Sequence, residues 1–186
     1  YPLRRQRQMC IRDRDVAVNQ ESIKEQLMKA LSEAAGHFSD SREKEGENLK
    51  TDILAKLEGM KENVAFIEER YPSIVSEYRK KLEDKVAELL GDTNVDENRI
   101  AAEVVIYSDK ICVDEETVRL KSHIDGMRDE LLKGGNVGRK LDFIAQEMNR
   151  EANTILSKAN DIEVSDHAID LKTEIEKIRE QVQNIE

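Results

Sequence analysis

The chain has little of what sheet-rich proteins usually contain. Its 186 residues include no tryptophan, two prolines and eight glycines, and aromatic residues make up only 4% of the sequence. Charged residues reach 38%, and leucine, isoleucine, valine and methionine supply the apolar side chains. This composition is typical of a solvated, helix-rich protein. We therefore predict an all-α fold, made of elongated antiparallel helical hairpins or a bundle, with heptad seams between long helices.

Cysteines and long apolar runs are also scarce. Cys10 and Cys112 can form at most one disulfide, and no cysteine and histidine spacing resembles a zinc site. No apolar run approaches the roughly 20 residues needed to cross a bilayer, and the N-terminus lacks the apolar stretch of a secretion signal. The sequence therefore predicts a soluble, cytoplasmic protein that does not bind membranes.

Residues 1–14 differ in charge from the rest of the chain. They carry five arginines and one aspartate, so subtracting their charge of +4 from the total of −10 leaves −14 on residues 15–186. The stretch QRQMCIRDR resembles translated sequencing-adapter sequence, and we expect residues 1–14 to be a non-native segment. The alternative is a basic arm that binds nucleic acid. Because the remainder is so acidic, any nucleic-acid site on it must be local.

Apolar residues recur at helical spacing in the first half of the chain. A first pattern predicts a helix from about Val18 to Gly36. A second predicts a helix over residues 49–71, whose three-and-four spacing is interrupted at Pro72, and a return helix over residues 74–89. We expect these two helices to form an antiparallel hairpin around Pro72.

The second half of the chain predicts four more helices. Asp96 and Asp114 are candidate N-caps for two of them, and Gly134 and Gly135 then break the chain. A long helix should run from Gly138 to about Ile162, and a last one should begin at Ser165 or Asp166. No linker separates these patterns, so residues 15–186 are expected to form one elongated helical unit.

The predicted helix from Gly138 has two chemically different faces. On a helical wheel one side carries a seam that should be buried: Leu141, Ala145, Met148, Ala152, Ile155 and Ala159. The opposite side carries a polar set with one aromatic ring: Arg139, Asp142, Phe143, Gln146, Glu147, Arg150, Asn153, Thr154 and Ser157. Arginines can grip phosphate, amides can pair with nucleobases and a phenyl ring can stack on a base. The alternative is a polar stripe paired to a neighbouring helix or subunit.

Several stretches resemble one known family. GRKLDFIAQEMNREANTI, SKAND and EIEKIREQVQNIE, together with SREKEG at 41–46 and VRLKSHI at 118–124, are similar in residues and order to the YicC/YloC-like endoribonucleases. The family usually has glycine where Leu156 stands and arginine near Asp166. The resemblance covers residues 15–186, which would then be the helical C-terminal part of a family chain whose strand-rich N-terminal domain is missing here.

This resemblance implies a function for the polar face. The chain would belong to a bacterial, metal-dependent enzyme that cleaves RNA phosphodiester bonds in RNA decay or small-RNA turnover, and that acts as a homo-oligomer, a hexamer. Such a reaction needs groups that hold phosphate, stabilise developing charge and move a proton. The candidate catalytic residues are His123, Asp142, Glu147 and Arg150.

Further candidates would bind RNA or metal. The residues expected to hold RNA or its phosphates are Arg119, Arg139, Lys140, Phe143, Gln146, Asn153, Thr154 and Lys158. The residues expected to hold Mn or Mg through carboxylate oxygens are Asp142, Glu147, Glu151 and Glu43.

Each assignment has a structural alternative. Glu147 and Glu151 can be simple ion-pair partners within their helix, His123 can be a helix-face histidine bonded to a neighbour, and Asp40 with Glu43 can form a capping box. The whole chain can also be a non-catalytic helical scaffold or an RNA-binding adaptor. The arginines and amides that share one stripe favour the enzyme.

Overall fold

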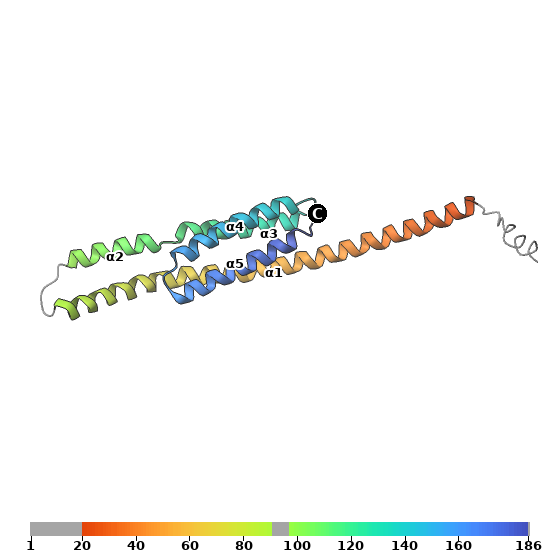
Figure 1. Cartoon of the computed structure of the whole chain (residues 1–186). Coiled ribbons are helices and arrows are strands. Elements are labelled where there is room, and N and C mark those ends of the chain that lie inside the picture. Colours follow the sequence, from red (N-terminus) through yellow and green to blue (C-terminus); the bar gives the residue numbers. More distant parts are fainter. Residues whose placement is uncertain (1–19, 91–96, 186) are drawn as a thin grey trace, which may run out of the picture. The chain divides into compact units, whose positions relative to one another are not determined.

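The computed structural model describes residues 20–90 and 97–185, and within these ranges every regular element is a helix (Figure 1). The elements are α1 (Gln20–Leu90), α2 (Glu97–Ile111), α3 (Asp114–Lys133), α4 (Gly138–Lys158) and α5 (Ile162–Val182). The predicted all-α class is confirmed. The chain divides into two compact units, residues 1–47 and 48–186, and α1 contributes to both. The expected segment 1–14 and the expected cap Asp96 lie outside the described residues.

The predicted hairpin around Pro72 is wrong. Helix α1 continues through Gly36 and Pro72 to Leu90, so the expected helix ends at these positions are absent. A proline inside a helix removes one hydrogen bond and costs about 3 kcal/mol. The apolar seam nevertheless stays in phase across it, because Ile67 and Ile74, seven residues apart, are both buried. Packing of this seam against the rest of its unit offsets the local cost.

Within residues 48–186, part of α1 packs with α3, α4 and α5 around an aliphatic core (Figure 1). Helix α4 is antiparallel to both neighbours: Lys158 at its end contacts Glu116 at the start of α3, and Gly138 at its start lies against Ile185 beyond the end of α5. The fully buried core includes Ile53, Met60, Val64, Leu120, Ile124, Met127, Leu141, Ala145, Met148, Ala152, Ile155, Ala168, Leu171, Ile175 and Ile178.

Helix boundaries near the C-terminus differ from those expected. Asp114 is the first residue of α3 and not its N-cap, a position that Val113 holds. Helix α5 begins at Ile162 instead of at Ser165 or Asp166, because the Asp161 carboxylate accepts a hydrogen bond from the amide of Val164 at 3.1 Å. That cap satisfies an otherwise unpaired helix N–H. Helix α4 accordingly stops at Lys158, before the cap.

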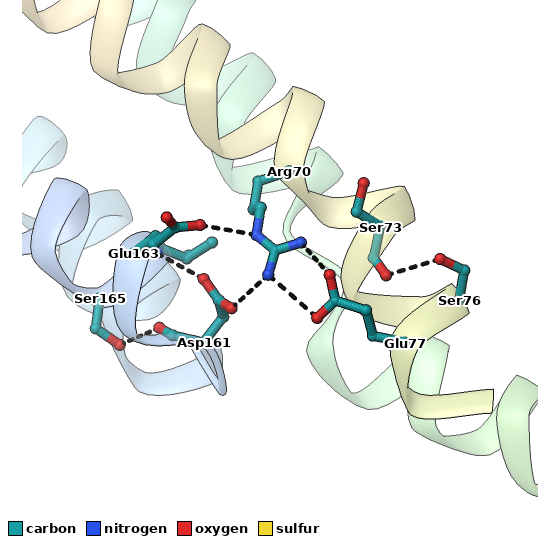
Figure 2. A network of polar contacts seen from close by, with 8 residues as sticks. Arg70, Ser73, Ser76, Glu77, Asp161, Glu163 and Ser165 are labelled. Carbon is teal, nitrogen blue, oxygen red and sulfur yellow. Dashed lines mark hydrogen bonds and ion pairs between the residues drawn. The ribbon is translucent and has the colours of Figure 1, made fainter. Parts of the chain in front are cut away.

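Arg70 of α1 binds acidic residues at the start of α5 and so joins that helix to α1 (Figure 2). Its guanidinium donates to Glu77 at 2.7 Å, to Asp161 at 3.0 Å and to Glu163 at 3.1 Å. The hydrogen bond to Glu77, followed by the nearby charge of Asp161, raises the pKa of Arg70 above its ordinary value. Since Asp161 also caps α5, one carboxylate fixes both the helix start and its place on α1. This contact helps to set the turn that follows α4.

In the first unit, the helical residues 20–47 expose their apolar side chains. Ile23, Leu27, Leu31 and Phe38 are each half exposed or more, so the seam expected there is not buried within the described residues. Asp40 and Glu43 lie inside α1, and the expected capping box therefore does not start a helix. In the part of the chain that the structure describes, no helix is long and apolar enough to span a bilayer.

Candidate functional site

Helix α4 has a buried face, two flanks that contact neighbouring helices, and one face that stays open. The buried face is the predicted seam, in which Leu141, Met148 and Ile155 are fully buried. We use the name "open face of α4" for the exposed residues on the opposite side, which are Arg139, Phe143, Gln146, Arg150, Asn153 and Ser157. The predicted division of this helix into an apolar and a polar side is confirmed.

The flank of α4 toward α5 is held by polar contacts. Asp142 accepts a hydrogen bond from Arg179 of α5 at 3.2 Å and another from Gln146 at 2.7 Å. Asn149 donates to Glu176 of α5 at 3.1 Å. Asp142, a candidate catalytic and metal-binding residue, therefore lies at the edge between α4 and α5 with both carboxylate oxygens engaged.

The flank of α4 toward α3 contains three of the other candidates. Lys158 donates to the Cys112 carbonyl at 2.9 Å and to Glu116 at 2.8 Å. Lys140 pairs with Glu130 of α3 at 2.8 Å, and Glu151 is 94% buried on this flank. Both lysine ammonium groups thus hold α3 and α4 together, so their expected role in phosphate binding stays a prediction.

His123 of α3 lies on the same side of its helix as two residues that contact α4. Arg119, one turn earlier, lies 3.9 Å from Glu151 of α4 and also pairs with Glu115. Glu130, two turns later, contacts α4 through Lys140. Within the described residues, His123 is half buried and forms no hydrogen bond or ion pair. Its ring nitrogens are available for proton transfer at the edge between α3 and α4.

The open face of α4 carries two arginines with few polar contacts. Within the described ranges Arg139 has no ion pair. Arg150 has 77% of its side chain exposed, and its contact to Glu147, three residues earlier in the same helix, is long at 4.0 Å. Phe143 is 62% exposed. Thr154 is half buried and its hydroxyl donates to the Arg150 carbonyl. Two guanidinium groups and a phenyl ring therefore face solvent on one stripe.

Comparison with known proteins identifies the family of this chain. A family model described as "Endoribonuclease YicC-like, C-terminal" matches residues 67–186, more than half of the chain. The chain belongs to the YicC-like endoribonuclease family. The family membership expected from the sequence is thereby confirmed, and α4 with both of its neighbours lies inside the matched region.

Two curated relatives carry the same name, "Probable endoribonuclease YicC". The protein from Clostridioides difficile is 45% identical over 161 residues, which cover 86% of this chain and 55% of the relative. The protein from Haemophilus influenzae is 34% identical over 166 residues, which cover 89% of this chain and 57% of the relative. The chain spans about half the length of the curated relatives it matches.

The four candidate metal ligands do not form a metal site in the described residues. Asp142 and Glu151 lie on opposite flanks of α4, Glu147 lies near Arg150, and Glu43 is exposed in the first unit. No group of three or more histidine, cysteine or acidic side chains in the described part of the chain is placed to share an ion. Mg and Mn complete their shell with water and phosphate oxygens around one or two carboxylates, so these four residues do not hold one ion together, and the metal-binding role of any single one stays a prediction. We assign the metal no ligand and no chemical step.

The sequence pattern of this YicC-like region does not reveal the residues of α5 that contact α4. Arg179 and Glu176 look like ordinary charged residues on a solvated helix, yet both bond to polar side chains of α4. Each directly follows a residue of the buried seam, Ile178 or Ile175. That place beside the seam is the signal that could have found them, because such positions lie at helix interfaces.

Proposed function

We propose that this chain belongs to an endoribonuclease that binds RNA along the open face of α4. The observation that carries the proposal is the pair of weakly engaged arginines, with an exposed phenyl ring between them, inside the YicC-like region. Exposed guanidinium groups bind phosphate through two parallel hydrogen bonds, and an exposed ring can stack on an unpaired base. A helix face that served only solubility would carry lysine and glutamate and would not need two arginines and a phenyl ring.

The spacing along α4 suits a short stretch of RNA. Arg139 and Arg150 are eleven residues apart, which corresponds to about 16 Å along the helix axis. Phe143 lies between them, about 6 Å from Arg139 and about 10 Å from Arg150 along the same axis. The two guanidinium groups can therefore hold separate phosphates of one strand while a base between them stacks on the ring.

His123 is the proposed proton-transfer group. A phosphodiester cleavage needs a base for the attacking oxygen and an acid for the leaving oxygen, and an unengaged imidazole can serve as either. Arg119, one turn away on α3, can stabilise negative charge that develops on the phosphate. Its existing contacts to Glu115 and Glu151 hold it at the α3 and α4 edge.

The family resemblance adds three further proposals. Cleavage would depend on a divalent ion, Mn or Mg. The active form would be a homo-oligomer, a hexamer, and the enzyme would act on RNA in the cytoplasm, in RNA decay or small-RNA turnover. Each is tested separately from the RNA contact, by metal titration, by measurement of oligomer size and by RNA profiling in cells.

The test is a cleavage assay on this chain and, beside it, on the full-length Clostridioides difficile relative. Each protein is incubated with end-labelled structured RNA and Mn, with and without a chelator. Internal cuts that disappear with the chelator support the proposal. RNA that stays intact with both proteins rejects it, and cuts by the relative alone show that its additional length is required.

Variants connect the cleavage to the open face of α4. Arg150→Ala and Gln146→Ala should each reduce cleavage about tenfold or more while helix content and oligomer size stay unchanged, because each removes an exposed contact and no core volume. Arg128→Ala is the matched control, since Arg128 is exposed on α3 and, among the described residues, pairs only with acids of its own helix. Equal losses in all three variants would reject the assignment of this face.

A non-catalytic role is the second candidate. The acidic charge and the buried heptad seams of α4 and α5 would suffice for a helical scaffold or an RNA-binding adaptor. RNA that binds in an Arg150-dependent way but is never cut, by this chain or by the relative, would favour the adaptor.

A further inference from the structure

A connected set of polar side chains links α5 to the open face of α4. We call it the α5-anchored amide network, and its members are Arg179, Glu176, Asp142, Gln146, Asn149 and Asn153. The first two belong to α5 and the others to α4. The network ends at two amides, Gln146 and Asn153, that lie on the open face.

The first branch fixes the direction in which the Gln146 amide points. An arginine can only donate hydrogen bonds and an ionised carboxylate can only accept them. Asp142 accepts from Arg179 Nε through Oδ1 at 3.2 Å and from Gln146 Nε2 through Oδ2 at 2.7 Å. Gln146 must therefore turn its NH₂ group toward Asp142, so that its carbonyl oxygen Oε1 is left for a ligand.

The second branch orients Asn153 in the same sense, through a longer final contact. The Glu176 carboxylate can only accept, so the NH₂ group of Asn149 faces it at 3.1 Å. The remaining carbonyl oxygen of Asn149 then accepts from Asn153 Nδ2 at 3.5 Å. Asn153 consequently leaves its own carbonyl oxygen for a ligand. Arg179 Nη1 lies 4.0 Å from Glu176, which joins the two branches on α5.

We propose that Arg179 and Glu176 are positioning residues that make the open face of α4 select hydrogen-bond donors of RNA. This rests on the proposed function. Gln146 and Asn153 are seven residues apart, about 10 Å along the helix, and both present acceptor oxygens. The donors that nucleotides offer are the ribose 2′-hydroxyl, the exocyclic amino groups of adenine, guanine and cytosine, and the ring N–H groups of guanine and uracil. A face with two oriented acceptors beside its arginines therefore binds RNA better than it binds a strand that lacks those donors.

A purely structural role explains the network less well. The side chains of Arg179 and Asp142 are 37% and 36% exposed, and ion pairs this exposed contribute little to stability. The apolar seam already joins α4 to α5 without them, through residues such as Met148 and Ile175 that are fully buried. What the network adds is a defined orientation of two exposed amides.

The test measures discrimination between ligands and not affinity alone. Binding of this chain is followed by fluorescence anisotropy with a mixed-sequence RNA, with its all-2′-deoxy counterpart, and with a uridine-only RNA that lacks exocyclic amino groups. The second ligand reports on the 2′-hydroxyl and the third on base amino groups. The variants are Glu176→Gln, which has the same shape but can donate and so lets the second branch reverse, and Arg179→Met, which removes the donor that holds the Asp142 carboxylate in place for Gln146.

Glu174→Gln is the matched control, because Glu174 lies on α5 and pairs with Lys177 outside the network. In Glu176→Gln and Arg179→Met we expect the preference for the mixed RNA over at least one of the other two ligands to fall about three- to tenfold, the effect of one hydrogen bond. Helix content should not change, and the control should keep the wild-type preferences.

Three results would overturn the inference. Wild-type preferences in both network variants, on both comparison ligands, would show that α5 does not orient the amides. An equal fall in the Glu174→Gln control would show an effect of charge alone. If the wild-type chain and the Arg150→Ala variant bind RNA equally well, or the wild type does not bind at all, the proposed function fails and takes this inference with it.

Discussion

Replacing Pro72 with alanine should stabilise the protein, which is the reverse of what a proline-made corner would predict. Pro72 lies inside α1 and is exposed, so the substitution removes no core contact. A proline in a helix interior costs about 3 kcal/mol relative to alanine. Alanine also gives the unfolded chain more conformational freedom, which reduces the gain in the free energy of unfolding by about 0.4–1 kcal/mol. The expected net gain is about 2 kcal/mol in the free energy of unfolding.

The measurement is urea denaturation followed by helical circular dichroism. With a slope of about 2 kcal/mol per molar urea, a gain of this size moves the midpoint up by about 1 M. Ser73→Ala is the control, since Ser73 is the next residue of the helix and also exposed, and it should shift the free energy by only a few tenths of a kcal/mol. A Pro72→Ala midpoint at or below the wild-type value would refute a continuous α1 and restore the corner.

Three other changes test the packing and the charges. Gly138→Ala should destabilise by about 1–3 kcal/mol, measured as a lower thermal midpoint, because a Cβ there would lie 2.3 Å from the Ile185 carbonyl oxygen. Met148→Asp should abolish cooperative unfolding, because Met148 is fully buried and a charge there would have no partner. The hydrogen bond from Gln181 holds the pKa of Asp52 below its usual value, so the ionised Asp52 carboxylate stabilises the folded state. This contribution to the free energy of unfolding is present at neutral pH and is lost as the pH falls below about 4. In Asp52→Asn, urea titrations should therefore show a shallower loss of stability between about pH 5 and pH 2.

The buried seams could be predicted from the sequence because one physical rule decides them. Leu141, Met148 and Ile155 recur at helical spacing and all three are buried, as are Leu171 and Ile178 in α5. Apolar residues that recur every three or four positions lie along one side of a helix, and that side must be buried. The spacing alone therefore identifies the buried side. The all-α class follows from the same rule, repeated along the chain.

The corner at Pro72 shows where this reasoning stops. A local preference argued for a helix end, but Ile67 and Ile74 pack into the same core on either side of the proline. The packing of these two residues outweighs the free-energy cost of a proline inside the helix. The apolar pattern of a single helix does not reveal such packing between helices. Helix α5 starts earlier than the sequence pattern predicts for a related reason, because the cap Asp161 comes before the first residue of the apolar pattern.

The candidate site was only partly predictable. The wheel identified Arg139, Gln146 and Arg150 as one polar face, and the structure leaves that face exposed. It could not show that Asp142 contacts α5 while Glu151 lies against α3, because a wheel describes one helix and not its neighbours. The expected set of metal ligands does not come together for this reason.

Photo-crosslinking tests the RNA contact most directly. RNA that carries 4-thiouridine at several positions is irradiated in complex with this chain, and the crosslinked peptides are identified by mass spectrometry. We predict that crosslinks concentrate in residues 138–158, with Phe143 the main site, and that Arg139→Ala with Arg150→Ala reduces them together with RNA affinity. Crosslinks that all fall outside α4, and that persist in the double variant, would contradict the proposed binding face.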